Sequence, residues 1–348
     1  MKKTSANEPF LGKRFKYNPN YINRSMSVAA SEAKSRVREN IRSGKYKYEN
    51  CGCYCGSEDA VLISEIDAYG NYYPLVLCKS CGIMRANPRW RKQDYVDFYM
   101  NEYRPLYGEK EKNNAEWNTL KLKEAKDVYN FITNHVTLPS NSVIFDIGCN
   151  KGIMLLPFRN AGSVVKGVDY GAENIEYGIE KMGLDLEVGG VETLRSFGKK
   201  ADLIILNHVF EHFLNIDEEL ERIHKVLKTS GYIYISVPGT FWWIENRCRG
   251  NIMGLFQNAH TWQFSLETLK YVMECNGFKL LFGNDKILSI FKCSSAMPRT
   301  RDSRPKGEFD KAIKYLNHKE KKYLPKYLII KIIEALGLRN RARKLLRM

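Results

Sequence analysis

The segment HVFEHF, residues 208–213, places two histidines and a glutamate within five positions of one another, directly after the apolar run ADLIILN. If this segment leaves a strand as a helical turn, His208, Glu211 and His212 lie at i, i+3 and i+4 on one face. Imidazole and carboxylate groups at this spacing can bind a divalent ion or transfer a proton. Alternatively, Glu211 and His212 simply cap and orient the loop. A further histidine, His260, lies just before a predicted helix.

A second group of residues with metal-ligand chemistry lies nearer the N-terminus, where five of the nine cysteines fall within a 31-residue window. In a reducing compartment such clustering favours metal ligation over disulfides. The C-x2-C pair at 78 and 81 is a strong knuckle signal, and tetrahedral zinc needs only four thiolates. The predicted ligands are Cys53, Cys55, Cys78 and Cys81, with Cys51 able to replace Cys53. An iron–sulfur cluster and five unligated buried thiols are the alternatives.

Two glycines and an acid mark a candidate nucleoside site. In FDIGCNKG, Gly148 and Gly152 bracket a tight turn between a predicted strand and a predicted helix, where backbone without a Cβ can approach a ligand closely. Asp169 closes the next predicted strand, and an acid at this place can accept hydrogen bonds from a ribose diol. A G-x-G-x-x-G loop is absent from the sequence, so these features favour a bound nucleoside over a nicotinamide dinucleotide.

Alternating apolar strands and helices position these groups. This alternation predicts a doubly wound, largely parallel α/β sheet, whose ligands bind outside the carboxyl ends of the strands. The strands are expected over 142–147, 164–169, 184–188, 201–207, 232–238 and 286–292, and the helices over 115–136, 153–162, 172–183 and 216–231.

The cysteine window is expected to form a small ribbon. Residues 60–66 and 72–78 alternate well enough for two strands joined by the turn AYGN. Too few apolar residues lie there to form a core without a metal. A basic helix ending at Gly44 precedes the ribbon, and the tyrosine-rich stretch 94–114 could form a lid or a substrate wall.

These motifs together resemble the class I S-adenosylmethionine-dependent methyltransferases. The resemblance rests on FDIGCNKG, GVD, ILNHVFEHF, IHKVLKTSGYIYISVP and HTWQFSLETLKYVMECNGF, and it covers about residues 115–292. Asn150 departs from the pattern, because many members have glycine there, and the loop is expected to close with less backbone freedom. The resemblance implies a cofactor site formed by Asp146, Gly148, Cys149, Asn150, Gly152, Asp169, Tyr170, Glu192 and Asn207.

The resemblance also implies that the loop carrying His260 folds back over residues 208–213. The arrangement is similar to that of small-RNA 3′-end and polyprenyl-phenol O-methyltransferases, which have Glu where this chain has His208. A divalent metal held by His208, Glu211, His212 and His260 would lower the pKa of an acceptor hydroxyl. Without a metal, His260 or His208 could act as the general base. Among the catalytic alternatives we favour His260 as the base, because functional groups favour loops held by a rigid scaffold.

The N-terminal pattern CYCGS … CKSCGIMRANP resembles a methyltransferase subgroup with a cysteine knuckle, whose members often act in bacterial sugar or surface-glycan biosynthesis. The resemblance implies methyl transfer to a hydroxyl, or less readily a carbon, of a nucleotide-linked or lipid-linked sugar. One alternative is an RNA methyltransferase that grips phosphates with the knuckle and the basic flanks. Another is a non-catalytic binding module, against which the intact loop, ribose acid and E-H turn argue.

The net charge of +16 is concentrated at the two ends of the chain. Residues 1–48 carry +9 and residues 299–348 carry +11, so the middle carries −4. Basic flanks suit polyanions or anionic lipid. The apolar residues between 328 and 338, with basic residues around them, predict an amphipathic helix that packs on the protein or lies on an anionic membrane.

The expected fold is therefore an α/β protein with a seven-stranded, mostly parallel, Rossmann-like sheet and a small N-terminal zinc-binding ribbon. Neither an apolar leader nor a long apolar span is visible, and we expect a cytoplasmic protein with peripheral membrane contact as an alternative. The expected domains are a basic helical arm (1–48), a zinc knuckle (49–92), a helical linker or lid (93–138), an S-adenosylmethionine-binding domain (139–293) and a basic tail (294–348).

Overall fold

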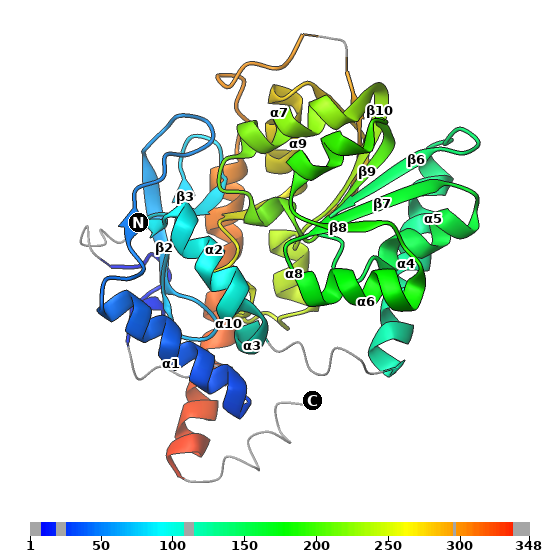
Figure 1. The fold of residues 1–348 in the computed structure, drawn as a ribbon. Coiled ribbons are helices and arrows are strands. Elements are labelled where there is room, and N and C mark those ends of the chain that lie inside the picture. Colours follow the sequence, from blue (N-terminus) through cyan, green and yellow to red (C-terminus); the bar gives the residue numbers. More distant parts are fainter. Residues whose placement is uncertain (1–7, 19–25, 108–114, 295–296, 337–348) are drawn as a thin grey trace.

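The computed structural model describes residues 8–18, 26–107, 115–294 and 297–336, which form two sheets with helices around them (Figure 1). The larger sheet has seven strands in the order β12-β13-β10-β9-β6-β7-β8. The strands are β6 (Val143–Ile147), β7 (Val164–Asp169), β8 (Leu186–Val188), β9 (Ala201–Asn207), β10 (Leu227–Ser236), β12 (Phe278–Gly283) and β13 (Leu288–Cys293).

Six of these strands run in the same direction, and β13 alone among the seven runs antiparallel, to both β10 and β12. The chain order reverses between β6 and β9, which creates the switch point where such sheets bind ligands. The predicted seven-stranded, mostly parallel sheet is confirmed.

Helices cover both faces of this sheet, which explains why its central strands are apolar at nearly every position. One core contains residues of α4 (Ala115–His135), α5 (Leu156–Asn160) and α6 (Ala172–Met182). The core on the opposite face contains residues of α7 (Ile216–Val226), α9 (Leu266–Cys275) and the 3-10 segment η3 (Val191–Phe197).

Two predicted helices are shorter in the structure. The helix expected over 153–162 is the 3-10 turn η2 (Ile153–Leu155) followed by α5, with Pro157 in its first turn. The helix expected over 216–231 ends at Val226, because Leu227 already pairs with Ala201 and begins β10. Pairing with the neighbouring strand thus takes precedence over the helical pattern there.

The second sheet is antiparallel, in the order β11-β4-β3-β2. Its two predicted strands, β2 (Ala60–Ile66) and β3 (Tyr72–Cys78), have the expected bounds. The sequence did not reveal β4 (Met84–Ala86) or β11 (Trp262–Gln263), and β11 comes from the methyltransferase-like part of the chain. A separate two-stranded ladder joins β1 (Tyr48–Glu49) to β5 (Arg89–Trp90).

The remaining helices surround this smaller sheet. An aromatic core includes side chains of α1 (Val28–Arg42), α2 (Lys92–Asn101) and α3 (Tyr103–Tyr107), so part of the predicted 94–114 segment is helical and its residues 108–114 lie outside the described ones. Another core joins β2 and β3 to η1 (Lys13–Phe15), η5 (Ile252–Leu255) and α10 (Glu308–Ala335). Between the sheets, α8 (Thr240–Asn246) follows β10. Among the described residues, no helix is both long and apolar enough to cross a membrane.

Candidate active site and cysteine cluster

The glycine loop after β6 has the backbone conformation that its sequence predicts. Gly148 and Gly152 have φ values of 70° and 75°, in the left-handed region. A Cβ added at Gly148 would lie 2.5 Å from Cγ2 of Val209, so a side chain there would collide with the turn that follows β9. Asn150 also adopts a left-handed φ of 53°, which asparagine tolerates better than most residues. The loop therefore closes despite the missing glycine.

Asp169 holds this loop in place at the end of β7. One carboxylate oxygen accepts the backbone N–H of Asn150 at 3.0 Å, and the other accepts that of Gly171 at 2.7 Å. Each oxygen has a second lone pair that can accept a ribose hydroxyl. Burial, with the charge of Asp169 as the smaller cause, raises the pKa of Asp146 well above its usual value.

The other predicted cofactor residues differ in how they face this site. Cys149 is buried in the core beneath the loop, so only its backbone can meet a ligand. Asn207 donates from Nδ2 to Oε1 of Glu124 at 3.2 Å. A Cβ added at Gly190 would lie within 3 Å of the Tyr170 hydroxyl and the Glu192 carboxylate, which places these two side chains together after β8. Their contacts with a cofactor remain predictions.

The turn at residues 208–213 is not the predicted helical turn. Only η4 (Phe210–His212) has 3-10 geometry, and His208 has a left-handed φ of 59°. The reason is that the His208 N–H still bonds to the Ser236 carbonyl at the end of β10, at 2.8 Å. His208 therefore belongs to the strand end, while Glu211 and His212 belong to the turn.

Glu211, His212 and His260 nevertheless come together. Their ligand atoms all lie within 4.8 Å of one another. His208 Nδ1 and His260 Nε2 lie 3.5 and 3.9 Å from Oε1 of Glu211, too far for normal hydrogen bonds. Glu211 is only 1% exposed, and neither carboxylate oxygen has a hydrogen-bond partner among the described residues. A buried carboxylate without donors is costly unless a cation or a ligand satisfies it.

The electrostatics of the cluster leave this carboxylate charged. Burial opposes ionisation of Glu211, but His208, His212 and His260 outweigh it and lower the Glu211 pKa to about 2. Burial and the neighbouring His212 lower the pKa of His260 to about 3. At neutral pH an ionised carboxylate thus faces a neutral His260.

The tautomer of His212 follows from its partners. Its Nδ1 lies 2.8 Å from the Ala259 carbonyl and 2.8 Å from the Tyr99 hydroxyl. A carbonyl only accepts, so Nδ1 carries the proton and Nε2 offers a lone pair. A carbonyl behind an imidazole is the usual support of a metal-binding histidine.

A small pocket, too narrow in this structure to hold a water molecule, borders the cluster, and its lining includes a residue that sequence reasoning missed. The pocket is lined by Glu211, Val237, Pro238, His260, Trp262, Gln263 and Phe264. Gln263 is 4% exposed, and both its side-chain amide atoms lack a hydrogen-bond partner among the described residues. No motif marks this glutamine, because its position depends on β11 joining the second sheet.

The loop that carries His260 is held by both sheets. The Tyr73 hydroxyl donates to the His260 carbonyl at 2.5 Å, and the Ala86 N–H donates to the Thr261 carbonyl at 3.0 Å. The Thr261 N–H in turn donates to the Glu211 carbonyl at 2.9 Å. The strand pair β4 and β11 thus connects the cysteine ribbon to the pocket.

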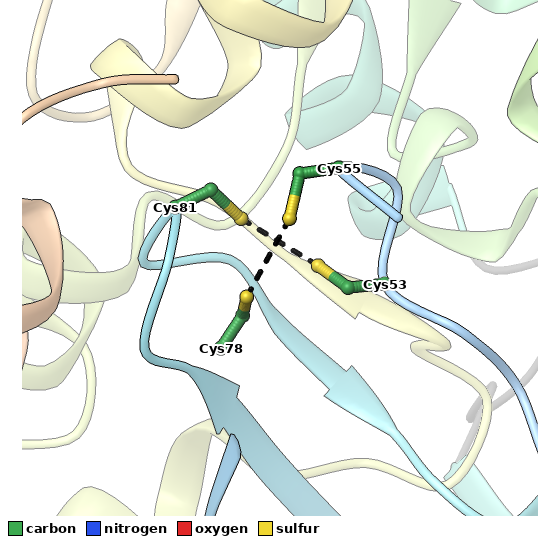
Figure 2. Close-up of side chains that lie close together, drawn as sticks. All are labelled: Cys53, Cys55, Cys78 and Cys81. Atoms are coloured by element: carbon green, nitrogen blue, oxygen red, sulfur yellow. Dashed lines mark hydrogen bonds between the residues drawn. The ribbon is translucent and has the colours of Figure 1, made fainter. Parts of the chain in front are cut away.

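Figure 2 shows the four sulfurs of Cys53, Cys55, Cys78 and Cys81 pointing toward one another. The sulfurs of 53 and 81 lie 3.5 Å apart, and those of 55 and 78 lie 3.6 Å apart. Four thiolates around zinc would be separated by about 3.8 Å, given Zn–S bonds of about 2.3 Å. The buried all-sulfur set therefore fits zinc. Cys51 lies outside this group, with its sulfur 3.4 Å from the Gly52 carbonyl.

Comparison with known proteins places a methyltransferase domain on residues 115–281, which match the family model described as "Methyltransferase domain". A "Ubiquinone biosynthesis O-methyltransferase" from Chelativorans sp. (strain BNC1) is 33% identical over 27% of this chain and 39% of its own length. A "Malonyl-[acyl-carrier protein] O-methyltransferase" from Priestia megaterium is 32% identical over 38% of this chain and 52% of its own length. The chain thus spans about two fifths to one half of these curated relatives.

Among solved structures, the magnesium protoporphyrin IX methyltransferase from Synechocystis PCC 6803 with bound SAH is similar, with 17% identity and a TM-score of 0.41. The match covers 58% of this chain and 98% of that one. The family match and the curated relatives agree with the predicted methyltransferase domain. The predicted resemblance to surface-glycan enzymes receives no support from these relatives.

Proposed function

We propose that this protein transfers the methyl group of S-adenosylmethionine to a hydroxyl group of a small-molecule acceptor. The observation that carries the proposal is the buried, ionised Glu211, which has no hydrogen-bond partner in the described structure and faces His212 and His260 beside a pocket. This cluster lies at the carboxyl end of β9, next to the glycine loop. Chemistry that removes a proton is needed at that place for O-methylation.

The glycine loop and Asp169 would bind the cofactor. Gly148 and Gly152 allow the backbone to approach it, and the two Asp169 oxygens would accept its ribose hydroxyls. The cofactor's sulfonium would then face the pocket beside Glu211. In the transfer, the bond from sulfur to methyl breaks as the bond from oxygen to methyl forms, which yields S-adenosylhomocysteine and a methyl ether.

The hydroxyl must lose its proton, and the cluster offers two ways. Glu211, His212 and His260 have the nitrogen and oxygen donors of a divalent-metal site, and the unsatisfied carboxylate is the feature that fits a cation. When bound, such a cation lowers the pKa of the acceptor hydroxyl. The metal-free alternative has His260 take the proton directly. We favour the metal site over the base predicted from the sequence, because a cation would neutralise the charge on Glu211.

The acceptor in this proposal is a hydroxyl compound, and the relative named "Ubiquinone biosynthesis O-methyltransferase" supports methyl transfer to such an oxygen. The malonyl relative supports transfer to oxygen only, because the malonyl group offers a carboxylate. Gln263 would orient the hydroxyl compound, because its buried amide offers both a donor and an acceptor to the pocket. The sugar or glycan predicted from the N-terminal pattern is one class of acceptor, and a phenol is the other. Among the described residues, we find no feature that favours the RNA alternative.

The test supplies labelled S-adenosylmethionine and panels of phenols, sugars and sugar nucleotides to the purified full chain. A labelled methyl ether from one of the hydroxyl panels is expected. Label that enters only RNA, or no acceptor at all while the cofactor binds, would contradict the proposal.

The same assay decides how the proton leaves. A brief treatment with a chelator should abolish activity, and Mg²⁺ or Mn²⁺ should restore it. Zinc is measured in the same samples, so that loss of metal from the cysteine cluster is not mistaken for loss from the active site. Mn²⁺ binding, followed by electron paramagnetic resonance, should weaken in Glu211→Gln. Activity that survives the chelator assigns the proton transfer to His260 alone.

A further inference from the structure

The last helix, α10, is firmly attached to the protein along its first half. Its residue Glu308 accepts a hydrogen bond from the Ser265 hydroxyl at 2.5 Å, and the Tyr315 hydroxyl donates to the Phe241 carbonyl at 2.9 Å. Arg14 forms two hydrogen bonds to Glu320, at 2.6 and 2.8 Å, and both side chains are almost fully buried. The inward-facing Leu316 is completely buried.

Beyond this attachment, the apolar side chains of the same helix face solvent. They recur at steps of three and four residues, which places them on one face of the helix. Their exposed fractions are 39% for Leu324, 51% for Leu328, 58% for Ile329 and 61% for Ile332, and Leu336, in the turn that follows the helix, is 67% exposed. Pro325 lies inside the helix where this change begins. In Figure 1 the red end of α10 extends away from both sheets.

Positive charge accompanies this exposed row. The second half of α10 carries four lysines, Lys321, Lys322, Lys326 and Lys331, and one glutamate. Lys321 and Lys322 are exposed on α10 itself. Two acids of the helix, Glu308 and Glu320, are buried against Ser265 and Arg14, and the exposed Asp310 lies in the first turn, at the far end from the apolar row. The projecting half of α10 is therefore both apolar and cationic.

We propose that this half of α10 docks on an anionic lipid bilayer, with its apolar row among the acyl chains and its lysines at the headgroups. An amphipathic helix with basic residues beside an apolar face binds such a surface through both contributions. A second copy of this chain would bring like charges together at the same face. A nucleic acid would leave the apolar row in water. An anionic bilayer matches both properties.

The experiment measures flotation of the full chain with vesicles of phosphatidylcholine alone and with phosphatidylglycerol added. The wild type should float with the anionic vesicles and much less with the neutral ones. Raising the salt from about 0.1 M to about 1 M shortens the screening length from about 10 Å to about 3 Å and should weaken binding. The variant Leu328→Ser/Ile329→Ser/Ile332→Ser should lower the bound fraction by about ten-fold or more, because it removes the inserted row.

A matched control carries Leu120→Ser and Leu281→Ser, two leucines that are 62% and 45% exposed on other elements. It should float like the wild type, and both variants should bind S-adenosylhomocysteine normally, which confirms their fold. The proposal is overturned if the triple variant floats like the wild type, or if the wild type binds neutral and anionic vesicles equally or not at all. It is also overturned if, without lipid, the wild type self-associates through this row and the triple variant does not.

Discussion

The two ligand clusters of this protein differ in the number and kind of their ligands and in whether they border a pocket. The cysteine cluster has four identical ligands, all buried, from two turns of one small sheet. The cluster of Glu211, His212 and His260 has three ligands of two kinds and borders a pocket. Structural zinc sites are closed by four protein ligands, whereas catalytic metal sites leave a position open. On this comparison we expect the first cluster to stabilise the fold and the second to take part in catalysis.

The two clusters are not independent, because the β4–β11 pair joins them. Arg85 of β4 pairs with Trp262 of β11, two residues after His260. The predicted cofactor residues Gly148 and Asp169 lie at strand ends of the other sheet. Unfolding of the ribbon should therefore displace His260 and leave cofactor binding unchanged. The following predictions test whether the two effects separate in this way.

Cys81→Ser should have the largest effect. Structural zinc contributes on the order of 10 kcal/mol to the folding of small metal domains, so loss of one ligand should unfold the ribbon and release the metal. Methyl transfer should be abolished because the His260 loop loses its support, while S-adenosylhomocysteine binding persists. Elemental analysis, limited proteolysis and calorimetry measure the three quantities.

The matched control is Cys51→Ser, since Cys51 lies outside the four-sulfur group. It should retain about one zinc per chain. If Cys51→Ser loses zinc and Cys53→Ser does not, the fourth ligand is Cys51 and not Cys53.

His260→Ala should have the next largest effect. It removes a metal ligand or the base itself, and turnover should fall by about 10² to 10⁴-fold, the usual contribution of positioned proton transfer. Zinc content and cofactor affinity should not change. The exposed His318, on α10, provides the control variant His318→Ala. Unchanged turnover in His260→Ala, when the chemical step limits the rate, would leave this cluster with only a structural role.

Asp169→Ala should weaken cofactor binding without affecting either cluster. The variant removes the two hydrogen bonds that the ribose hydroxyls would donate to the carboxylate. It also removes the bond from the Asn150 N–H to Asp169, which holds the loop. The cost in binding free energy should be at least about 1.5–3 kcal/mol. Calorimetry with S-adenosylhomocysteine measures it. Affinity equal to that of the wild type would refute the ribose assignment.

Tyr73→Phe should have the smallest effect. It tests most directly whether the second sheet supports the His260 loop independently of the cysteine cluster. The change removes one hydroxyl that donates to the His260 carbonyl, worth about 1 kcal/mol. Turnover should fall by about five-fold, with zinc content unchanged. A loss of zinc would mean that Tyr73 acts on the ribbon, and an unaltered rate would mean that β4 and β11 alone hold the loop.

The large sheet was predictable because its strands are long apolar runs that alternate with helices. The runs 201–207 and 164–169 coincide with β9 and β7, and the glycine loop and Asp169 follow from their ends. The two-stranded ribbon was predictable for a similar reason, since seven-residue strands carry a visible alternation.

The active-site mouth was less predictable because it depends on contacts between distant segments. The strands β4 and β11 have three and two residues, too few for any period to appear. Gln263 reaches the pocket only through their pairing, and His208 leaves the expected turn only because its N–H bonds to β10. The candidate zinc ligands, by contrast, could be predicted from their spacing, which favoured Cys53, Cys55, Cys78 and Cys81 with Cys51 as the alternative. The structure groups the first four and leaves Cys51 outside.

The pairing of β4 with β11 also has a consequence for the order in which the chain is made. During synthesis β4 leaves the ribosome about 176 residues before β11, and at about 5–20 residues per second the interval is roughly 9 to 35 s. For that time the ribbon can bind its metal, but the outer edge of β4 has no strand to pair with, and such an edge invites pairing with other chains. Because β4 has only three residues, its unpaired edge is short. Few hydrogen-bonding groups are therefore open to other chains before β11 is synthesised.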